Sequence, residues 1–317
     1  MVCHFNLLRV IKMYNGVFPI FKEKGLTSHD VVYKMRKILH MKKVGHTGTL
    51  DPDVTGVLPI VVGEATKLTE YMQIKDKSYS AEVTLGISTE TEDAQGEVTE
   101  TVQMERLSDD AIDEAIQAFT GEYHQQVPLY SSVKVDGRKL YEYARSGEPV
   151  ERPVKTVYIR DIERTGEIEF TESTIKFNID VTCSKGTYIR TLAVDIGRAL
   201  GVPAHMSDLV RTASCGFNIS DTITLDDLRM LEDDKKEEYL QPVKDIISEE
   251  NLLEIDDEQL LFKVQHGQKL IKSDIMEMVS QKDKYIVFLK DGKPIGMYHQ
   301  HPEKEAELKP YKMFNRL

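Results

Sequence analysis

Cysteine is scarce in this 317-residue chain, and its placement excludes the common uses of a cysteine pair. The chain contains only Cys3, Cys183 and Cys215, an odd and scattered set without C-x-x-C spacing. Such a set supports neither a disulfide framework nor a zinc site. Because proteins without structural disulfides are typical of reducing compartments, we expect a cytoplasmic protein without a bound metal.

Long apolar runs are also missing. No stretch approaches the roughly 20 continuous apolar residues that a membrane span requires. The first 11 residues are interrupted by His4 and Arg9 and lack a small-residue cleavage site, so they do not look like a secretory signal. We find no nucleotide-binding motif, metal-ligand pattern or internal repeat, and we therefore expect no cofactor and no membrane contact.

The negative balance of charge, −12 from 41 basic and 53 acidic residues, argues superficially against a nucleic-acid partner. The acidic excess, however, lies mainly in residues 90–114 and 221–258, whereas residues 22–43 are predominantly basic. Salt screens exposed charges beyond about 10 Å, so an acidic protein can still carry a local basic surface. The net charge therefore does not exclude RNA as a ligand.

Residues 45–59 contain three glycines and two prolines, a composition that excludes a regular helix. The largely apolar residues 57–62 follow and can anchor the segment in a core. The segment therefore predicts a tight loop that holds the carboxylate of Asp51 beside His46 and two threonine hydroxyls. Loops on a rigid scaffold often carry catalytic groups, which makes Asp51 a candidate.

Short motifs leave the role of Asp51 open. The D-x-D-x-T order of residues 51–55 occurs in phosphatases that form a phosphoaspartate and bind Mg²⁺. That chemistry needs the first aspartate at the end of a buried parallel strand, which should be a continuous apolar run. Residues 44–50 are not such a run. A structural turn, in which Asp51 only accepts hydrogen bonds from backbone amides, is the other alternative.

A longer pattern favours a different chemistry. Residues 45–52, followed by residues 55–59 and 63–67, strongly resemble the TruB family of tRNA pseudouridine synthases. The resemblance as a whole covers roughly residues 13–317 and is densest in residues 13–216. It implies that Asp51 is the catalytic aspartate of an isomerase that converts the T-loop uridine (position 55) of tRNA to pseudouridine.

The resemblance also implies roles for other side chains. Tyr79 is expected to stack on the target base and to take part in catalysis, and Arg190 is expected to pair with Asp51 and hold it ionised. The implied substrate-binding residues are His46, Tyr79, Tyr188 and Leu209. Without the resemblance, Tyr79 would be an ordinary half-buried strand aromatic and Arg190 part of a surface salt bridge. In the family, two arginines follow the leucine that corresponds to Leu209. In this chain only one of them, Arg211, is present.

Periodicity predicts several elements directly. Alternation from Tyr79 to Leu85, and again over residues 175–181, predicts two strands with one buried face. A helix should begin near Thr27 or Ser28 and bury Val31, Val32, Met35, Ile38 and Leu39. A second helix should follow residue 188 and end at Gly201, and a third should cover residues 107–119. We expect residues 86–98 to be an acidic loop.

Domain organisation follows from length and resemblance together. Single cores stop growing near about 250–300 residues, so this length suits two domains. The resemblance implies an α+β fold in which an extension (residues 1–12) precedes a catalytic domain (residues 13–245) on a mixed, largely antiparallel sheet. A small PUA-like β-barrel domain, an RNA-binding module, should occupy residues 246–317. Within it, Asp291 and Gly292 between apolar runs predict a hairpin.

The expected partner is the T-arm stem-loop of tRNA, bound by a monomer without an obligatory protein partner. Residues 126–145 combine cations with tyrosines, which suits phosphates and exposed bases, although a core helix with a solvated basic edge would look similar. An RNA-binding or tRNA-folding factor with secondary catalysis remains the main alternative, ahead of the phosphatase.

Overall fold

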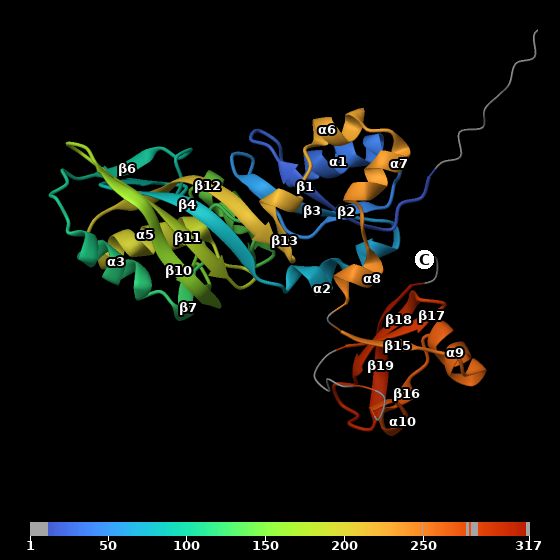
Figure 1. The fold of residues 1–317 in the computed structure, drawn as a ribbon. Helices are drawn as coiled ribbons and strands as arrows, with labels where there is room; N and C mark the ends of the chain where they lie inside the picture. The colour runs from blue at the N-terminus through green and yellow to red at the C-terminus, as the bar shows by residue number, and fades with distance from the viewer. Residues whose placement is uncertain (1–11, 249, 277–278, 280–284, 315–317) are drawn as a thin grey trace, which may run out of the picture.

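The computed structural model describes residues 12–248, 250–276, 279 and 285–314 (Figure 1). The predicted extension, residues 1–12, therefore lies outside the described residues except for Lys12. A larger α+β body leads through α8 (Val243–Ile246) into a smaller C-terminal body. In the described part of the chain, no helix has both the length and the apolar character that would let it cross a membrane.

The larger body is built on one ten-stranded sheet, as the predicted mixed, largely antiparallel architecture requires. Among its described pairings, that of β12 with β3 is the parallel one. In spatial order its main path is β14 (Gln241–Pro242), β1 (Gly16–Lys22), β3 (Thr55–Val62), β12 (Ala204–Ser214), β4 (Lys77–Leu85), β11 (Ile175–Cys183), β10 (Val154–Phe170) and β7 (Gly121–Gln126). Two short strands lie off this path: β2 (Val44–His46) pairs with β3, and β13 (Phe217–Asn218) pairs with β12.

The two alternating segments form neighbouring strands of this sheet. Ala81, Val83 and Leu85 of β4 are buried, and β11 alternates between buried and accessible side chains along its whole length. Thr84 is buried as well, and its hydroxyl is satisfied there by a hydrogen bond of 2.8 Å that it donates to Ser207. The pattern of apolar residues therefore determined which face of each strand meets the core.

Helix α1 (Ser28–Ile38) begins where its capping sequence predicts. Thr27 is the N-cap, and its side chain exchanges hydrogen bonds with Asp30 in a capping box, which satisfies two backbone donors at the helix start. The predicted face is buried, with Val31, Val32, Met35, Ile38 and Leu39 in the core. Helix α1 therefore presents its remaining side chains, several of them basic, away from the sheet.

Two longer helices also match their predictions. Helix α5 (Ile189–Ala199) is followed by Gly201 in the left-handed region, and α3 (Asp109–Gln117) lies within the predicted range. The other helical segments of this body are short: η1 (Gly63–Leu68), α2 (Thr69–Gln73), η2 (Ile219–Asp221), α6 (Leu225–Met230), α7 (Asp233–Lys236) and η3 (Glu237–Tyr239).

The expected acidic loop at residues 86–98 was wrong in part. It contains β5 (Ile87–Thr89), which pairs with β6 (Val98–Thr101) in a separate two-stranded sheet. All four residues of β6 are exposed, so this sheet lacks a buried face and leaves no apolar alternation in the sequence. Ser88 and Thr99 instead join the strands through a hydroxyl–hydroxyl bond of 2.9 Å.

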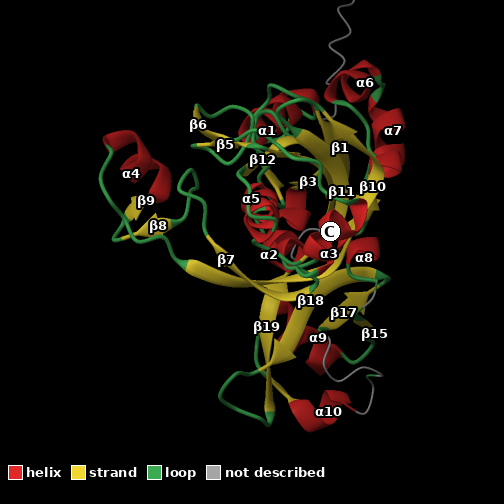
Figure 2. Cartoon of the chain, turned by 90° about the vertical axis from the view of Figure 1, so that its left-hand side faces the viewer, coloured by secondary structure: helices red, strands yellow, loops and turns green. Residues whose placement is uncertain are grey.

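Between β7 and β10 the chain forms a projecting segment, residues 127–153, which we call the arm. It carries a small hairpin of β8 (Lys134–Val135) and β9 (Arg138–Lys139), followed by α4 (Leu140–Ser146). Figure 2 shows these elements standing clear of the main sheet. Gly147 ends α4 in the left-handed conformation, with φ of 68°.

The C-terminal body is a five-stranded sheet in the order β15–β17–β18–β19–β16, consistent with the predicted PUA-like domain. Its strands are β15 (Asn251–Glu254), β16 (Leu270–Ile271), β17 (Ile286–Lys290), β18 (Lys293–Gln300) and β19 (Glu307–Met313), and its helices are α9 (Glu258–Gln265) and α10 (Lys272–Met276). The predicted hairpin is present: Asp291 and Gly292 join β17 to β18 with φ of 50° and 71°.

The two bodies share apolar core. Side chains from both contribute to one buried cluster, including Val57, Val61, Leu68, Val287, Met297 and Phe314. Lys67 adds a hydrogen bond of 2.6 Å to the carbonyl of Met313 across the junction. The predicted domain boundary at residues 245–246 falls within α8, whose Val243 and Ile246 join the same cluster, and it stays a prediction.

Candidate active site

Asp51 lies in the loop that connects the antiparallel strands β2 and β3. The glycine at position 56 is required where this loop enters β3. Gly56 has φ of +112°, and a β-carbon there would stand 2.2 Å from the carbonyl oxygen of Arg211 on neighbouring β12. Since the loop follows no buried parallel strand, the geometry of a phosphoaspartyl phosphatase is absent around Asp51, and that alternative was wrong.

Two buried cations hold the loop from beneath through its carbonyl groups. The ammonium of Lys22 donates to Pro52 at 3.0 Å and to Val54 at 2.7 Å. The guanidinium of Arg211 donates to the carbonyl of Gly48 at 3.3 Å, while its side chain is 1% exposed. Burial lowers the pKa of Lys22, and the nearby carboxylates oppose that shift. Arg211 is therefore a support of the loop and is too buried to contact phosphate.

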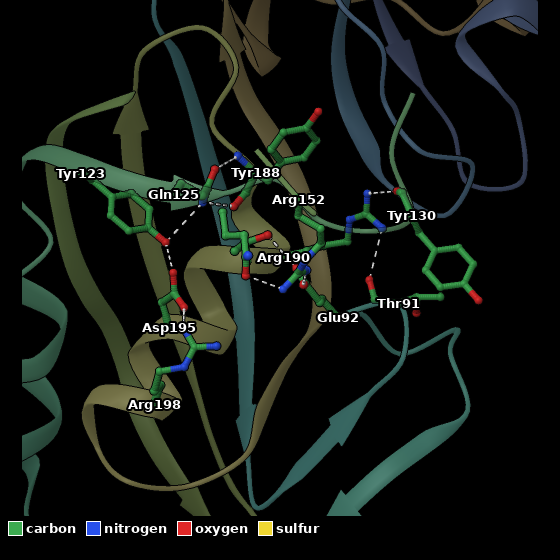
Figure 3. Close-up of polar contacts among 12 residues, drawn as sticks. Thr91, Glu92, Tyr123, Gln125, Tyr130, Arg152, Tyr188, Arg190, Asp195 and Arg198 are labelled. Atoms are coloured by element: carbon green, nitrogen blue, oxygen red, sulfur yellow. Dashed lines mark hydrogen bonds and ion pairs between the residues drawn. The ribbon is translucent and has the colours of Figure 1, made fainter. Parts of the chain in front are cut away.

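Arg190 faces Asp51 across the site. One guanidinium nitrogen lies 3.4 Å from a carboxylate oxygen of Asp51, and the two side chains are 10% and 50% exposed respectively. The guanidinium also contacts the carbonyls of Thr91 and Tyr130, each at 3.2 Å (Figure 3). It lies 3.4 Å from the carboxylate of Asp93 as well. The cation is thus held rigidly by three other oxygens, while the Asp51 carboxylate remains accessible from the pocket.

A pocket of about 680 Å³ opens over Asp51 and Arg190, a volume typical of small-ligand sites. It brings together five of the six predicted site residues: Asp51, Tyr79, Tyr188, Arg190 and Leu209. The arm contributes further lining residues, namely Tyr130, Ser131, Ser132, Tyr141 and Arg145. An adjoining hollow of about 470 Å³ shares Asp51, Arg190 and Leu209 with it and extends past Asp93.

The pocket walls are aromatic and apolar near the carboxylate. Burial raises the pKa of the Tyr79 hydroxyl, and the charge of Arg211 opposes that shift. Burial likewise raises the pKa of the Tyr188 hydroxyl. Both phenols are therefore neutral near neutral pH, and with the buried Leu209 they form surfaces on which a flat ring can stack.

The sixth predicted residue, His46, does not line the pocket in the described structure. Its Nδ1 accepts a hydrogen bond of 3.3 Å from the backbone of Gly48, at the start of the loop. Burial lowers the pKa of His46, and the charges of Arg211 and His29 lower it further. His46 is therefore a neutral imidazole that braces the loop.

Sequence reasoning missed Asp93, which contacts Arg190 from the misassigned 86–98 segment. Its neighbour Glu92 has φ of 65°, pairs with Arg152 at 3.1 Å and accepts a hydrogen bond of 2.6 Å from Thr191. These contacts join residues more than fifty positions apart in the sequence, so no local pattern predicts them. Within the described residues, no group of three or more potential metal ligands is present.

Comparisons with known proteins agree with this geometry. Residues 36–189 match the family described as "TruB family pseudouridylate synthase (N terminal domain)", and residues 190–248 match "tRNA pseudouridylate synthase B C-terminal domain". The chain is 49% identical over 308 residues to tRNA pseudouridine synthase B of Staphylococcus epidermidis, covering 96% of this chain and all of that protein. It is 47% identical over 306 residues to the Bacillus pumilus protein of the same name, covering 96% and 99% of the two chains.

Two solved structures share this architecture. A chain from "Crystal Structure of a Cbf5-Nop10-Gar1 Complex" matches with a TM-score of 0.67 at 27% identity, covering 93% of this chain and 83% of that one. A chain from "Structure of H/ACA RNP bound to a substrate RNA containing 2'-deoxyuridine" matches with the same TM-score at 25% identity, covering 94% and 84%. The overall fold is therefore one that solved structures share along most of the chain.

Proposed function

Because the chain belongs to the TruB family and is an isomerase that forms pseudouridine in tRNA, we propose that Asp51 acts on the T-loop uridine at position 55. The reaction breaks the bond between N1 and C1′, turns the base, and forms a bond between C5 and C1′. The proton on C5 is lost and N1 ends protonated, so atoms and electrons balance without a redox partner. The observation that carries the proposal is the accessible Asp51 carboxylate, 3.4 Å from a buried arginine at the floor of the pocket.

The role of Asp51 is that of an anion presented to the nucleoside. Arg190 is the adjacent cation, with a guanidinium nitrogen 3.4 Å from a carboxylate oxygen of Asp51. An ionised carboxylate serves both conceivable routes, addition to the base and assistance to departure at C1′. Tyr79, on β4 at the edge of the same pocket, is the aromatic group assigned to stack on the base and to take part in proton handling.

A uridine in a folded T-loop must leave its stack before C1′ and C5 are reachable, at a cost of a few kcal/mol. Tyr79, Tyr188 and Leu209 are the groups that receive the flipped base. Base–aromatic stacking contributes about 1–3 kcal/mol per base, which offsets much of that cost. His46 acts indirectly, by bracing the loop that carries Asp51.

The T-arm is the proposed recognition element, because its shape and phosphates can be reached from several basic surfaces. On the arm, Arg145 lies 5.3 Å from the ring centre of Tyr141, and both line the pocket. A second hollow at the end of α1 is lined by Tyr33, Arg36, Lys37, His40, Met41 and Lys42. In the C-terminal body, His266 and Lys293 line a third, which extends the RNA footprint.

We assign these surfaces to a monomer that works in the cytoplasm without an obligatory protein partner. The alternative, an RNA-binding or tRNA-folding factor with secondary catalysis, draws on the same surfaces, since the α1 hollow and the C-terminal hollow do not include Asp51. A folding activity that survives loss of the carboxylate would give the protein a second role beside catalysis.

The proposal is tested with two tRNA transcripts that differ at one nucleotide. Wild-type enzyme should form one pseudouridine in a transcript with uridine at T-loop position 55 and none in a transcript with cytidine there. Both transcripts should bind with the same affinity. Pseudouridine that maps to another position, or that still forms in the cytidine transcript, would contradict the assignment of the substrate.

A further inference from the structure

Gln125 is a buried polar side chain for which the proposed chemistry has no direct use. It lies on β7 and is 1% exposed. On this strand Tyr123 and Gln125 face inward, whereas Glu122, His124 and Gln126 are exposed. A buried amide is costly unless both its donor and its acceptor are satisfied, so the partners of Gln125 show what it is there to hold.

Both polar atoms of the Gln125 amide are bonded to the backbone of Tyr188, and Nε2 makes a second, longer hydrogen bond of 3.4 Å to the hydroxyl of Tyr123 (Figure 3). Its Oε1 accepts a hydrogen bond of 2.7 Å from the backbone N–H of Tyr188, and its Nε2 donates one of 2.8 Å to the Tyr188 carbonyl. This is the two-bond exchange that joins a hydrogen-bonded pair of residues in an antiparallel sheet. Tyr188 is the N-cap of α5 and makes no side-chain capping bond, so Gln125 fixes the start of that helix.

The start of α5 determines where two pocket side chains point. The ring of Tyr188 lines the pocket, and Arg190, in the first turn of α5, reaches Asp51. Arg190 also donates to the carbonyl of Tyr130, which follows Gln125 along the chain into the arm. The base of the arm is therefore fastened to the catalytic helix at two points, Gln125 to Tyr188 and Tyr130 to Arg190.

We propose that Gln125 is a positioning residue of the isomerisation, whose side-chain amide aims the Tyr188 ring and the Arg190 guanidinium at Asp51. The inference rests on the proposed role of the Asp51 pocket. Misplacement of a reacting group by about 1 Å can cost ~100-fold in rate, so a lost amide should reduce kcat. It should leave KM for tRNA within about threefold, because the basic surfaces are untouched.

Tyr123 provides a matched comparison on the same strand. Its hydroxyl is also buried and also bonds to α5, but to Asp195 in the middle of the helix (Figure 3). Tyr123→Phe removes this contact, together with the 3.4 Å hydrogen bond that the hydroxyl accepts from Gln125 Nε2, and leaves both bonds between Gln125 and Tyr188 in place. If Gln125 only packed β7 against α5, Tyr123→Phe would have the same effect on kcat as removal of the amide.

Gln125→Glu gives the sharpest test, because its protonation state changes its hydrogen-bond pattern. A neutral glutamic acid offers one donor and one acceptor, like the amide, whereas a carboxylate offers only acceptors. Burial raises the pKa of such an acid, so the variant should recover its donor as the pH is lowered. The ratio of variant kcat to wild-type kcat is taken at each pH, so that pH effects common to both enzymes cancel. It should rise from ~1/100 in mildly alkaline buffer toward unity in mildly acidic buffer.

The experiment measures kcat and KM for tRNA in steady-state pseudouridine formation by the wild type, Gln125→Glu, Gln125→Met and Tyr123→Phe, with thermal unfolding recorded at each pH. The methionine of Gln125→Met cannot ionise, so this variant should lose rate by a factor that does not depend on pH. It replaces Gln125→Glu as the test if the latter unfolds. Tyr123→Phe should stay within about threefold of wild type in kcat. A pH-independent ratio for folded Gln125→Glu, or equal losses in Gln125→Met and Tyr123→Phe, would overturn the proposal. Asp51→Asn is assayed alongside, because activity retained by this variant would overturn the proposed function itself. The ratios for the Gln125 variants test the positioning role separately.

Discussion

The loop around Asp51 and the arm line the same pocket but are built in opposite ways. The loop is held from below by the buried cations Lys22 and Arg211, whose donors are bonded to its backbone carbonyls. The arm is mostly accessible, and its cations lie over the rings of its own tyrosines: Arg138 over Tyr143, and Arg145 over Tyr141. One side of the pocket is fixed by the core, and the other is joined to it mainly at its base.

This difference matches the two tasks of the site. A reacting carboxylate must stay within a fraction of an ångström of its target, which favours support by buried groups with satisfied hydrogen bonds. Recognition of a folded RNA needs reach and positive charge, which exposed side chains on a projecting segment supply. We therefore expect substitution of the pocket-lining carboxylate of the loop to lower kcat, and substitution of a pocket-lining cation of the arm to raise KM.

The largest effect is expected for Asp51→Asn, with Asp53→Asn as its matched control. Loss of the anion should reduce kcat by at least ~1,000-fold, because the amide can neither add to the base nor stabilise developing charge at the sugar. Asp53→Asn should stay within about threefold, since Asp53 does not line the main pocket. Steady-state assays and RNA binding by filter retention check both variants. If Asp51→Asn keeps a tenth of wild-type activity, the loop that carries Asp51 does not supply the reacting group.

A smaller loss is expected for Arg190→Lys, with Arg152→Lys as control. A lysine keeps the charge but cannot reach the oxygens of Asp51, Asp93, Thr91 and Tyr130 together, so kcat should fall about 100-fold. Arg152 belongs to the same polar network but pairs with Glu92, away from Asp51, and its replacement should change kcat by less than about fivefold. Equal losses in kcat would mean that the network has only a structural role.

On the arm, Arg145→Ala should raise KM for tRNA about fivefold and leave kcat within about twofold, the result of lost uniform binding. The slope of log affinity against log salt should become shallower by roughly 0.7–0.9 for one lost phosphate contact. Arg138→Ala is the control, because Arg138 pairs with Glu148 at 2.7 Å and does not line the pocket. A fall in kcat without a change in KM would erase the distinction between arm and loop.

The smallest effect is expected at the hollow beside α1, which belongs neither to the loop around Asp51 nor to the arm. Lys37 lies 4.4 Å from the ring centre of Tyr33, and Lys42 lines the same hollow. Lys37→Ala should raise KM by about twofold to threefold. Arg106→Ala, which removes a similar cation from the ring of Phe170 on an acidic part of the surface, should change nothing. Indistinguishable KM values for the two variants would remove this hollow from the RNA footprint.

Local pattern predicted much of the fold because local physics determines it. The capping sequence at Thr27 determined the start of α1, alternation determined the buried faces of β4 and β11, and the Asp291–Gly292 pair determined a hairpin. The 86–98 segment failed because a small exposed sheet has no buried face to leave a pattern. The candidate site residues were predicted from the resemblance to the TruB family, because local pattern alone allowed structural roles for Asp51, Tyr79 and Arg190.

What sequence could not supply is the set of contacts between distant residues. Asp93 and Arg190 meet across 97 positions, and Gln125 and Tyr188 across 63, so neither pair has a shared local signal. Arg211 also shows how chemistry alone misleads. An arginine in an RNA-modifying enzyme suggests a phosphate contact, yet its burial under Gly48 makes it a support of the loop.

The central claim, that the Asp51 pocket isomerises a uridine with its own side chains, is tested most directly on an isolated T-arm hairpin in excess EDTA. The buffer contains monovalent salt, and thermal melting of the hairpin with and without EDTA is the control for an effect of the chelator on the RNA. The account predicts one pseudouridine at the T-loop site, formed at the same single-turnover rate with and without EDTA. Loss of product in EDTA with recovery on added Mg²⁺ would contradict it.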